Sequence, residues 1–292
     1  MAPVLPRAAR KLAERLRTRR LLRNYRLDSP GRWLDEVARS AGGTDRLPTW
    51  DMFSREIDYY ASRYDLCTFM QWPPIAKSMV VDSRFVDIEL AELQSSAHWP
   101  RFSDALVDRV VGMPRPYPPL PYSTANLVHH AYHLHRFEAA FARLDRNATV
   151  LEFGGGYGSM CRLIANYAGF DRYLIYDLPA LSAIQRYFLA AALDAEACAA
   201  VEYVTATEEL ADLEPDLFIS TWGLSEVPLA LRKVFEPIIA RSRHVLIAYQ
   251  ADIDGIDNQE YFRALSATTG HRVAISEIAH KRRNFYLLGT RA

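Results

Sequence analysis

The stretch Val150-Leu151-Glu152-Phe153-Gly154-Gly155-Gly156-Tyr157-Gly158 decides how the rest of this chain is interpreted. An apolar run gives way to glycines there, and residues 159–167 follow with helical spacing. Glycines at the end of a strand permit a tight turn and let the backbone approach a ligand closely. The start of a helix adds amide donors that have no partner inside the helix. The segment therefore predicts a strand–turn–helix unit that binds a nucleotide-like ligand.

Outward from this turn, strands and helices alternate to residue 289. Such alternation is typical of right-handed β–α–β units and a parallel sheet. The last two strands are joined directly by the polar turn 279–284, so one of them should run antiparallel. The prediction is an α/β protein with a seven-stranded sheet. We expect strands at 149–153, 173–176, 201–204, 216–220, 244–249, 272–278 and 285–289, and helices at 159–167, 180–193, 229–240 and 258–266.

The first half of the chain is predicted to be mostly helical. Residues 114–121 contain five prolines and cannot form a helix, so we expect an extended connector that runs over the surface. A helix follows, which Ser123 or Thr124 can cap, and it should end near residues 145–147. We therefore divide the chain into a helical region, 1–122, that sets acceptor specificity, and a ligand-binding domain, 123–292. Aromatic residues of the first half that suit stacking on an acceptor are Tyr59, Tyr60, Tyr64, Phe69, Trp72, Trp99 and Tyr122.

Composition limits the classes of partner. Thirty-five basic and 35 acidic residues give a formal net charge of zero, so the chain lacks the overall basic field of a nucleic-acid-binding protein. The three cysteines form no CxxC pair, which argues against a disulfide framework and a cysteine zinc site and favours a cytoplasmic location. No apolar run approaches the roughly 18 residues that a membrane-spanning helix needs. Composition leaves the oligomeric state open, with a homodimer as one alternative.

The first 26 residues differ from the rest in charge. They carry nine basic side chains against the single acid Glu14, interleaved with leucines. Two interpretations stay open: an amphipathic helix that contacts a membrane surface or a partner, or a solvated terminal helix.

Two nucleotide-type ligands suit the glycine turn, NAD(P) and S-adenosyl-L-methionine (SAM). Asp177 ends the next predicted strand, where a carboxylate can accept hydrogen bonds from the hydroxyls of a ribose. The dinucleotide fingerprint would require a third glycine at position 159, which is Ser159. Glu152 favours SAM, because a carboxylate beside the turn suits an ammonium and a sulfonium better than a pyrophosphate.

Two segments resemble known proteins. Glu152-x-Gly154-x-Gly156-x-Gly158 is similar to the first motif of class I SAM-dependent methyltransferases, in which an acid placed like Asp177 holds the ribose. Residues 216–226, Asp-Leu-Phe-Ile-Ser-Thr-Trp-Gly-Leu-Ser-Glu, resemble the motif after the fourth strand in a group of sugar O-methyltransferases. The resemblance covers residues 123–292 and implies a Rossmann-like methyltransferase sheet, SAM as cofactor and a sugar or glycosylated metabolite as the small-molecule acceptor. The SAM contacts that we expect are Glu152, Gly154, Gly155, Gly156, Asp177, Leu178, Thr221 and Trp222.

Methyl transfer to a hydroxyl requires in-line positioning and a base. Glu226 is the leading candidate, since the loop after the fourth strand faces the ligand in this fold; a helix-capping role is the alternative. His129 and His130, on the helix before the sheet, are further candidates, although an ordinary polar helix face explains them too. Three acids in residues 252–257 lack full EF-hand spacing, so we predict no metal. N- or C-methylation of another metabolite and a non-catalytic SAM-binding scaffold remain open.

Overall fold

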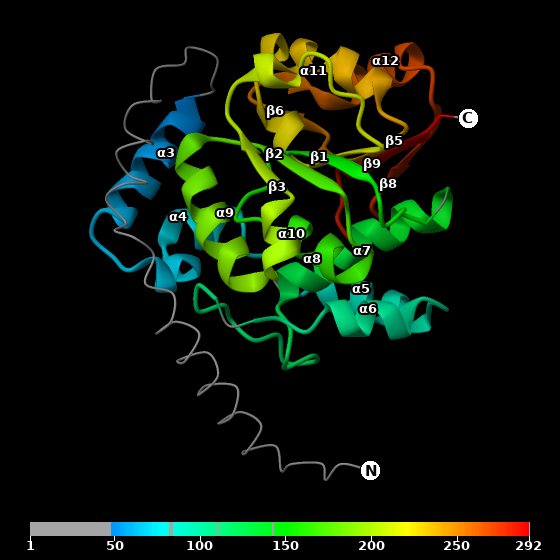
Figure 1. Cartoon of the computed structure of the whole chain (residues 1–292). Coiled ribbons are helices and arrows are strands. Elements are labelled where there is room, and N and C mark those ends of the chain that lie inside the picture. Colours follow the sequence, from blue (N-terminus) through cyan, green and yellow to red (C-terminus); the bar gives the residue numbers. More distant parts are fainter. Residues whose placement is uncertain (1–47, 82–83, 110, 142, 292) are drawn as a thin grey trace.

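The computed structural model describes residues 48–81, 84–109, 111–141 and 143–291 (Figure 1). The basic segment 1–26 lies outside these residues, so both interpretations of it stay predictions. Within the described ranges, no helix is long and apolar enough to cross a membrane.

A seven-stranded sheet in the order β3-β2-β1-β4-β5-β9-β8 forms the centre of the protein. Strands β1 to β5 are parallel, and β9 runs antiparallel between β5 and β8, so the predicted fold class is confirmed. The central strands are buried on both faces, which explains their nearly continuous apolar sequences. The strands are β1 (Thr149–Phe153), β2 (Arg172–Tyr176), β3 (Val201–Val204), β4 (Leu217–Thr221), β5 (His244–Gln250), β8 (Arg272–Glu277) and β9 (Asn284–Thr290).

Helices cover both faces of the sheet (Figure 1). On one face lie α7 (Ala125–Ala140), α8 (Ser159–Tyr167) and α9 (Pro179–Ala192), with α10 (Ala195–Ala199) next to β3. On the other face, α11 (Leu229–Arg241) and α12 (Asn258–Thr268) enclose a second apolar core around Phe218 and Phe235.

The first-half helices form an outer layer on the α7–α9 side. These are α3 (Pro48–Ala61), α4 (Pro73–Ser78), α5 (Val86–Ser95) and α6 (Trp99–Ala105). Helix α5 packs on α7, α6 on α8 and α3 on α9. Phe102 of α6 stacks on Tyr167 of α8 with ring centroids 4.3 Å apart. The apolar core is therefore continuous across residue 122, and the division of the chain at that point stays a prediction.

Two local expectations in the first half were wrong. Helix α7 begins after the cap Thr124 as predicted, but it ends at Ala140 rather than near residues 145–147, because the backbone of Phe141 leaves the helical conformation (φ −134°, ψ −75°). Beyond the helix, the Leu144 amide donates to the Glu138 carboxylate at 3.0 Å. The proline-rich connector is free of helix but does not lie wholly on the surface. Tyr117 and Leu120 pack into the core, and the Tyr117 hydroxyl donates to Asp87.

Two short elements were not predicted: α10 and the hairpin of β6 (Asp252–Ile253) and β7 (Ile256–Asp257). The hairpin accounts for two of the three acids in that loop. Asp252 pairs with Arg283, and Asp257 caps α12 by accepting from the Glu260 amide at 2.9 Å. Among the described residues, no group of three histidine, cysteine or acidic side chains is arranged to hold a metal ion.

Candidate active site

A cavity of about 1330 Å³ opens at the carboxyl ends of the parallel strands. Phe153, Tyr176, Thr205 and Thr221, at the ends of β1 to β4, all line it. Small-molecule pockets usually measure about 300–1,000 Å³. The cavity is therefore large enough for a nucleoside cofactor together with an acceptor.

The glycine turn forms one wall of this cavity. Gly154 and Gly156 have φ angles of 75° and 59°, in the left-handed region that glycine adopts without steric cost. A Cβ on Gly155 would lie 2.6 Å from the Ile175 side chain, and one on Gly154 would lie 3.0 Å from the Gly223 Cα. Close packing of β1 against β2 and against the loop after β4 therefore requires these glycines.

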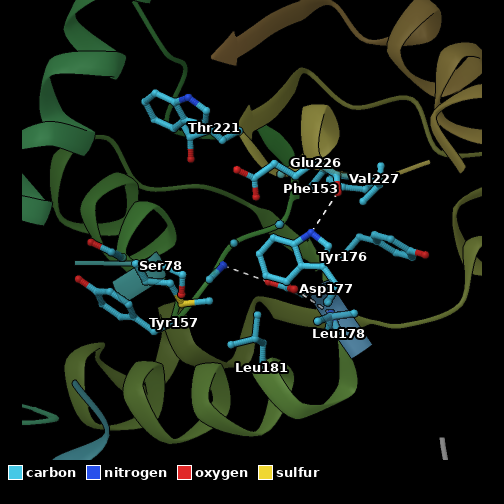
Figure 2. Close-up of a pocket in the computed structure, with 18 of the residues that line it drawn as sticks. Ser78, Phe153, Tyr157, Tyr176, Asp177, Leu178, Leu181, Thr221, Glu226 and Val227 are labelled. Atoms are coloured by element: carbon cyan, nitrogen blue, oxygen red, sulfur yellow. Dashed lines mark hydrogen bonds between the residues drawn. The ribbon is translucent and has the colours of Figure 1, made fainter. Parts of the chain in front are cut away.

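Asp177 is held rigidly beside the turn. Its Oδ2 accepts from the Gly156 amide at 3.0 Å and from the Gln185 side chain at 2.8 Å, and its Oδ1 accepts from the Leu178 amide at 2.7 Å. Figure 2 shows Asp177 and Leu178 in the cavity wall. Asp177 lines the cavity, so its carboxylate is placed to accept hydrogen bonds from ligand hydroxyls. Gln185, on α9, carried no signal in the sequence.

Glu152 lies beneath the turn rather than in the cavity wall. Its side chain is 1% exposed and accepts a hydrogen bond from the Tyr173 hydroxyl at 2.8 Å. Its Oε2 lies 3.1 Å from where a Gly155 Cβ would stand. Burial raises the pKa of Glu152 to about 8. Direct contact between Glu152 and SAM stays a prediction.

The loop after β4 is closed by its own serines. Ser220 Oγ accepts from the Leu224 amide at 2.8 Å, and Ser225 Oγ donates to the Trp222 carbonyl at 2.6 Å. Trp222 has a φ of 68°, which turns the chain into a short 3₁₀ helix, η3 (Gly223–Glu226). Thr221, Trp222 and Glu226 all line the cavity.

Glu226 has its carboxylate turned into the cavity (Figure 2). Burial raises the pKa of this carboxyl to about 7, although the Lys281 ammonium acts to lower it. The backbone carbonyl of Glu226 accepts from the Trp50 indole at 3.0 Å, which joins α3 to the cavity rim. A carboxyl that titrates near neutrality is well suited to accept a proton from a substrate.

The fully buried Arg232 holds both neighbours of Glu226. Its guanidinium donates to the Ser225 carbonyl at 2.6 Å and to the Val227 carbonyl at 2.8 Å. A third bond, 2.6 Å long, reaches the side chain of Asn258 at the start of α12. Sequence reasoning missed this clamp, because an arginine within a helix gives no sign of which carbonyls it will reach.

His129 and His130 both line the cavity, as their place on one helix suggested. Nδ1 of His129 lies 2.8 Å from both carboxylate oxygens of Glu89, on α5. Burial lowers the pKa of His129 well below its usual value and that of His130 to about 4, so both rings are neutral at pH 7. Nε2 of His129 is buried without a partner among the described residues.

The other polar groups near His129 come from elements remote in the sequence. His280 Nε2 lies 2.7 Å from the same Glu89 carboxylate, and the next residue, Lys281, lines the cavity. His133 instead shares a 2.5 Å hydrogen bond with the Tyr286 hydroxyl, outside the cavity wall. Nothing in the sequence marked Glu89, His280 or Lys281 as part of a site.

The first-half aromatic residues that line the cavity are not those expected from the sequence. Trp50 and Phe85 line the cavity together with Trp222, whereas Phe69 and Trp72 are buried in the core and Tyr59 and Tyr64 are exposed at the surface. None of the seven first-half aromatic residues that the sequence suggested for stacking on an acceptor lines the cavity within the described ranges.

No family model and no curated protein matches this sequence. Solved structures with a similar fold include three methyltransferases. The methyltransferase domain of bacterial CtHen1 is 10% identical, with a TM-score of 0.43 over 56% of this chain and 97% of that chain. The precorrin-6Y C5,15-methyltransferase of Geobacter metallireducens is 14% identical, with a TM-score of 0.40 over 58% and 90%. The glycopeptide N-methyltransferase MtfA is 12% identical, with a TM-score of 0.42 over 56% and 90%.

Proposed function

We propose that this protein is a SAM-dependent methyltransferase that methylates a hydroxyl of a small molecule, a sugar or a glycosylated metabolite. One observation carries the proposal. A single cavity is lined by the glycine turn, by Asp177, a carboxylate placed to bind a ribose, and by the polar side chains of Glu226 and His130.

The cofactor side fits SAM. Asp177 would hold the ribose, and the glycine turn leaves room for the backbone to pass close to the cofactor. Phe153, Tyr176 and Leu178 supply apolar surface for a flat base. SAM would supply a methyl group already made electrophilic by the sulfonium, so the residues opposite need only orient the acceptor and remove its proton.

Glu226 is the base that the site favours. Its carboxylate faces the cavity, and a pKa of about 7 makes it an acceptor for the hydroxyl proton as the new O–C bond forms. His130 lines the same cavity and is neutral, so it is the second candidate. His129 also lines the cavity, but its Nε2 is buried and its Nδ1 lies against Glu89, so it is a weaker candidate than His130.

The acceptor side fits a ring with polar substituents. Trp50 and Phe85 offer aromatic faces of the kind on which sugars and other rings pack, and Glu226, His130 and Gln250 offer hydrogen-bonding groups. The Ser-Thr-Trp-x-x-Ser-Glu segment, which suggested a sugar acceptor, forms the loop that presents Glu226.

Calorimetric titration of the purified full chain with SAM, its demethylated product and NAD tests the cofactor assignment. We expect micromolar binding of SAM or its product and none of NAD. Transfer of labelled methyl from SAM to a panel of sugars, glycosylated metabolites, phenols and amines then tests the acceptor class. Binding of NAD in place of SAM would refute the proposal, and methylation confined to amines would refute the hydroxyl assignment.

A further inference from the structure

Lys281 places a positive charge in the acceptor side of the cavity. It lies in the turn between β8 and β9 and lines the cavity. Its Nζ stands 3.8 Å above the centroid of the Trp222 indole and 5.4 Å from that of the Phe85 ring. An ammonium over aromatic faces is attracted by the ring quadrupole. The two rings therefore hold the charge at a defined position.

Lys281 in the turn and Asn284, the first residue of β9, both contact the Trp222 side chain. Lys281 covers its face, and Asn284 accepts a hydrogen bond from the indole Nε1 at 2.7 Å. Trp222 and Glu226 belong to the same closed loop after β4, with Glu226 at the end of η3. The Trp222 side chain thus ties the turn after β8 to the loop of Glu226, and Lys281 and Glu226 both line the cavity.

The ammonium lacks a dedicated counter-ion. None of the ion pairs within the described ranges includes Lys281. The two carboxyls that act on it are Glu89 and Glu226. Burial raises the pKa of Glu89 to about 9, so Glu89 keeps its proton at neutral pH. Glu89 is already bonded to His129 and His280, whereas none of the described residues donates to the Glu226 carboxylate. A partly buried, unpaired ammonium is costly, and Glu226 is the carboxylate left to compensate it.

We infer that Lys281 is a positioning residue of the acceptor site, whose ammonium, held over Trp222, keeps the Glu226 carboxylate ionised beside the acceptor hydroxyl. The inference rests on the proposed function for the role of Glu226 as base. The other groups that face Lys281 are Glu89 of α5, His129 and His133 of α7 and the adjacent His280, and burial holds these histidines neutral. Among the described residues, Lys281 is therefore the charged group that opposes the effect of burial on Glu226.

The titration of Glu226 can be followed without an acceptor. Protein labelled with glutamate that carries ¹³C at the carboxyl is titrated by NMR, and the Glu226 signal is assigned by its loss in Glu226→Gln. In Lys281→Met the apparent pKa of Glu226 should rise by about one pH unit, because the compensating charge is gone. Lys281→Arg, which keeps the charge, and Arg282→Gln, which removes a charge from the exposed neighbouring residue, should leave it unchanged.

An unchanged Glu226 pKa in Lys281→Met would overturn the inference, and so would an equal rise in Lys281→Arg, since the effect would then come from packing. If Lys281→Met does not fold, Lys281→Gln replaces it under the same criteria. SAM titration of the wild-type chain is run in parallel. Failure to bind SAM would refute the proposed function, while the NMR titration would still decide whether Lys281 controls Glu226.

Discussion

Asp177 and Glu226 are carboxylates of the same cavity, but their surroundings give them different chemistry. Asp177 accepts hydrogen bonds from three amide donors, which fix its orientation. Glu226 is partly buried and receives no such bonds from the described residues, so its pKa rises to about 7. The first arrangement suits the binding of hydroxyls, and the second suits proton transfer.

Replacing Asp177 by Ala should weaken SAM binding at least about tenfold, because a charged hydrogen bond to the ribose is lost. Calorimetry measures the change. Asp171→Ala is the matched control, since Asp171 is an exposed carboxylate before the other end of β2. Equal SAM affinity in Asp177→Ala and the wild type would refute the ribose assignment.

Replacing Glu226 by Gln should lower turnover by about 10²–10⁴-fold and leave SAM affinity intact, because the amide cannot take a proton. In the wild type, kcat/KM should rise with pH through an apparent pKa near 7, as the carboxyl becomes ionised. Full activity in Glu226→Gln would move the role of base to His130, and a variant at that position would then be assayed.

At the scale of elements, helix α11 anchors the loop that carries Glu226. Arg232 lies in the first turn and a half of α11 and reaches back to the carbonyls of Ser225 and Val227. The planar guanidinium makes these bonds in a fixed fork that an ammonium cannot reproduce. The position of the candidate base therefore depends on the docking of α11 and, through Asn258, of α12.

Replacing Arg232 by Lys should destabilise the protein by about 1–3 kcal/mol, because buried carbonyls lose their donors. Turnover should fall more than SAM affinity, because the proposed cofactor contacts in the glycine turn and at Asp177 follow β1 and β2, whereas the loop of Glu226 follows β4. Thermal unfolding and steady-state kinetics measure the two effects. Arg241→Lys is the control, because Arg241 also binds carbonyls, of Leu213 and Ala211, at the far end of α11. Equal loss of turnover in the two variants would contradict the clamp.

At the scale of the whole molecule, the site lies between two layers of separate origin. The sheet supplies the cofactor wall, and the outer helices α3 and α5 supply Trp50 and the Glu89 carboxylate behind His129. The core that joins these layers also buries ionisable groups, among them Glu152 and Glu89. Their protonation couples the stability of the whole fold to pH.

Above about pH 7.5, where histidines are largely neutral in the folded and the unfolded chain, stability should fall as the pH rises. Folded Glu152, with its pKa raised to about 8, keeps a proton that the unfolded chain has released, so the free energy of unfolding decreases by up to about 1.4 kcal/mol per pH unit for this group. Denaturant unfolding at pH 7.5, 8.0 and 8.5 measures the slope. Glu152→Gln should reduce the slope and leave the part due to Glu89, whose pKa burial raises to about 9, and an unaltered slope would show that Glu152 titrates normally.

Local sequence determined most of the second half of the protein. The limits of β1, α8 and β3 agree with the prediction, and the other predicted sheet strands and the helices between them agree within about two residues, because apolar periodicity and glycine punctuation are local signals. The sequence also predicted that the glycine turn, Asp177 and Glu226 lie close to one another. Parallel strands bring their carboxyl ends to one edge of a sheet, so residues at those ends must meet.

Only the tertiary structure decided which side chains complete the site. Glu89 contributes from α5, Lys281 from the turn after β8 and Arg232 from α11. Glu152 lies beneath the glycine turn, where it accepts a hydrogen bond from Tyr173. No local sequence pattern predicts these contacts, because the sequence around a charged residue of a helix or turn can be the same whether its side chain faces solvent or a buried partner. Their role is set by the packing of elements far apart in the chain, which determines their burial, their partners and hence their protonation.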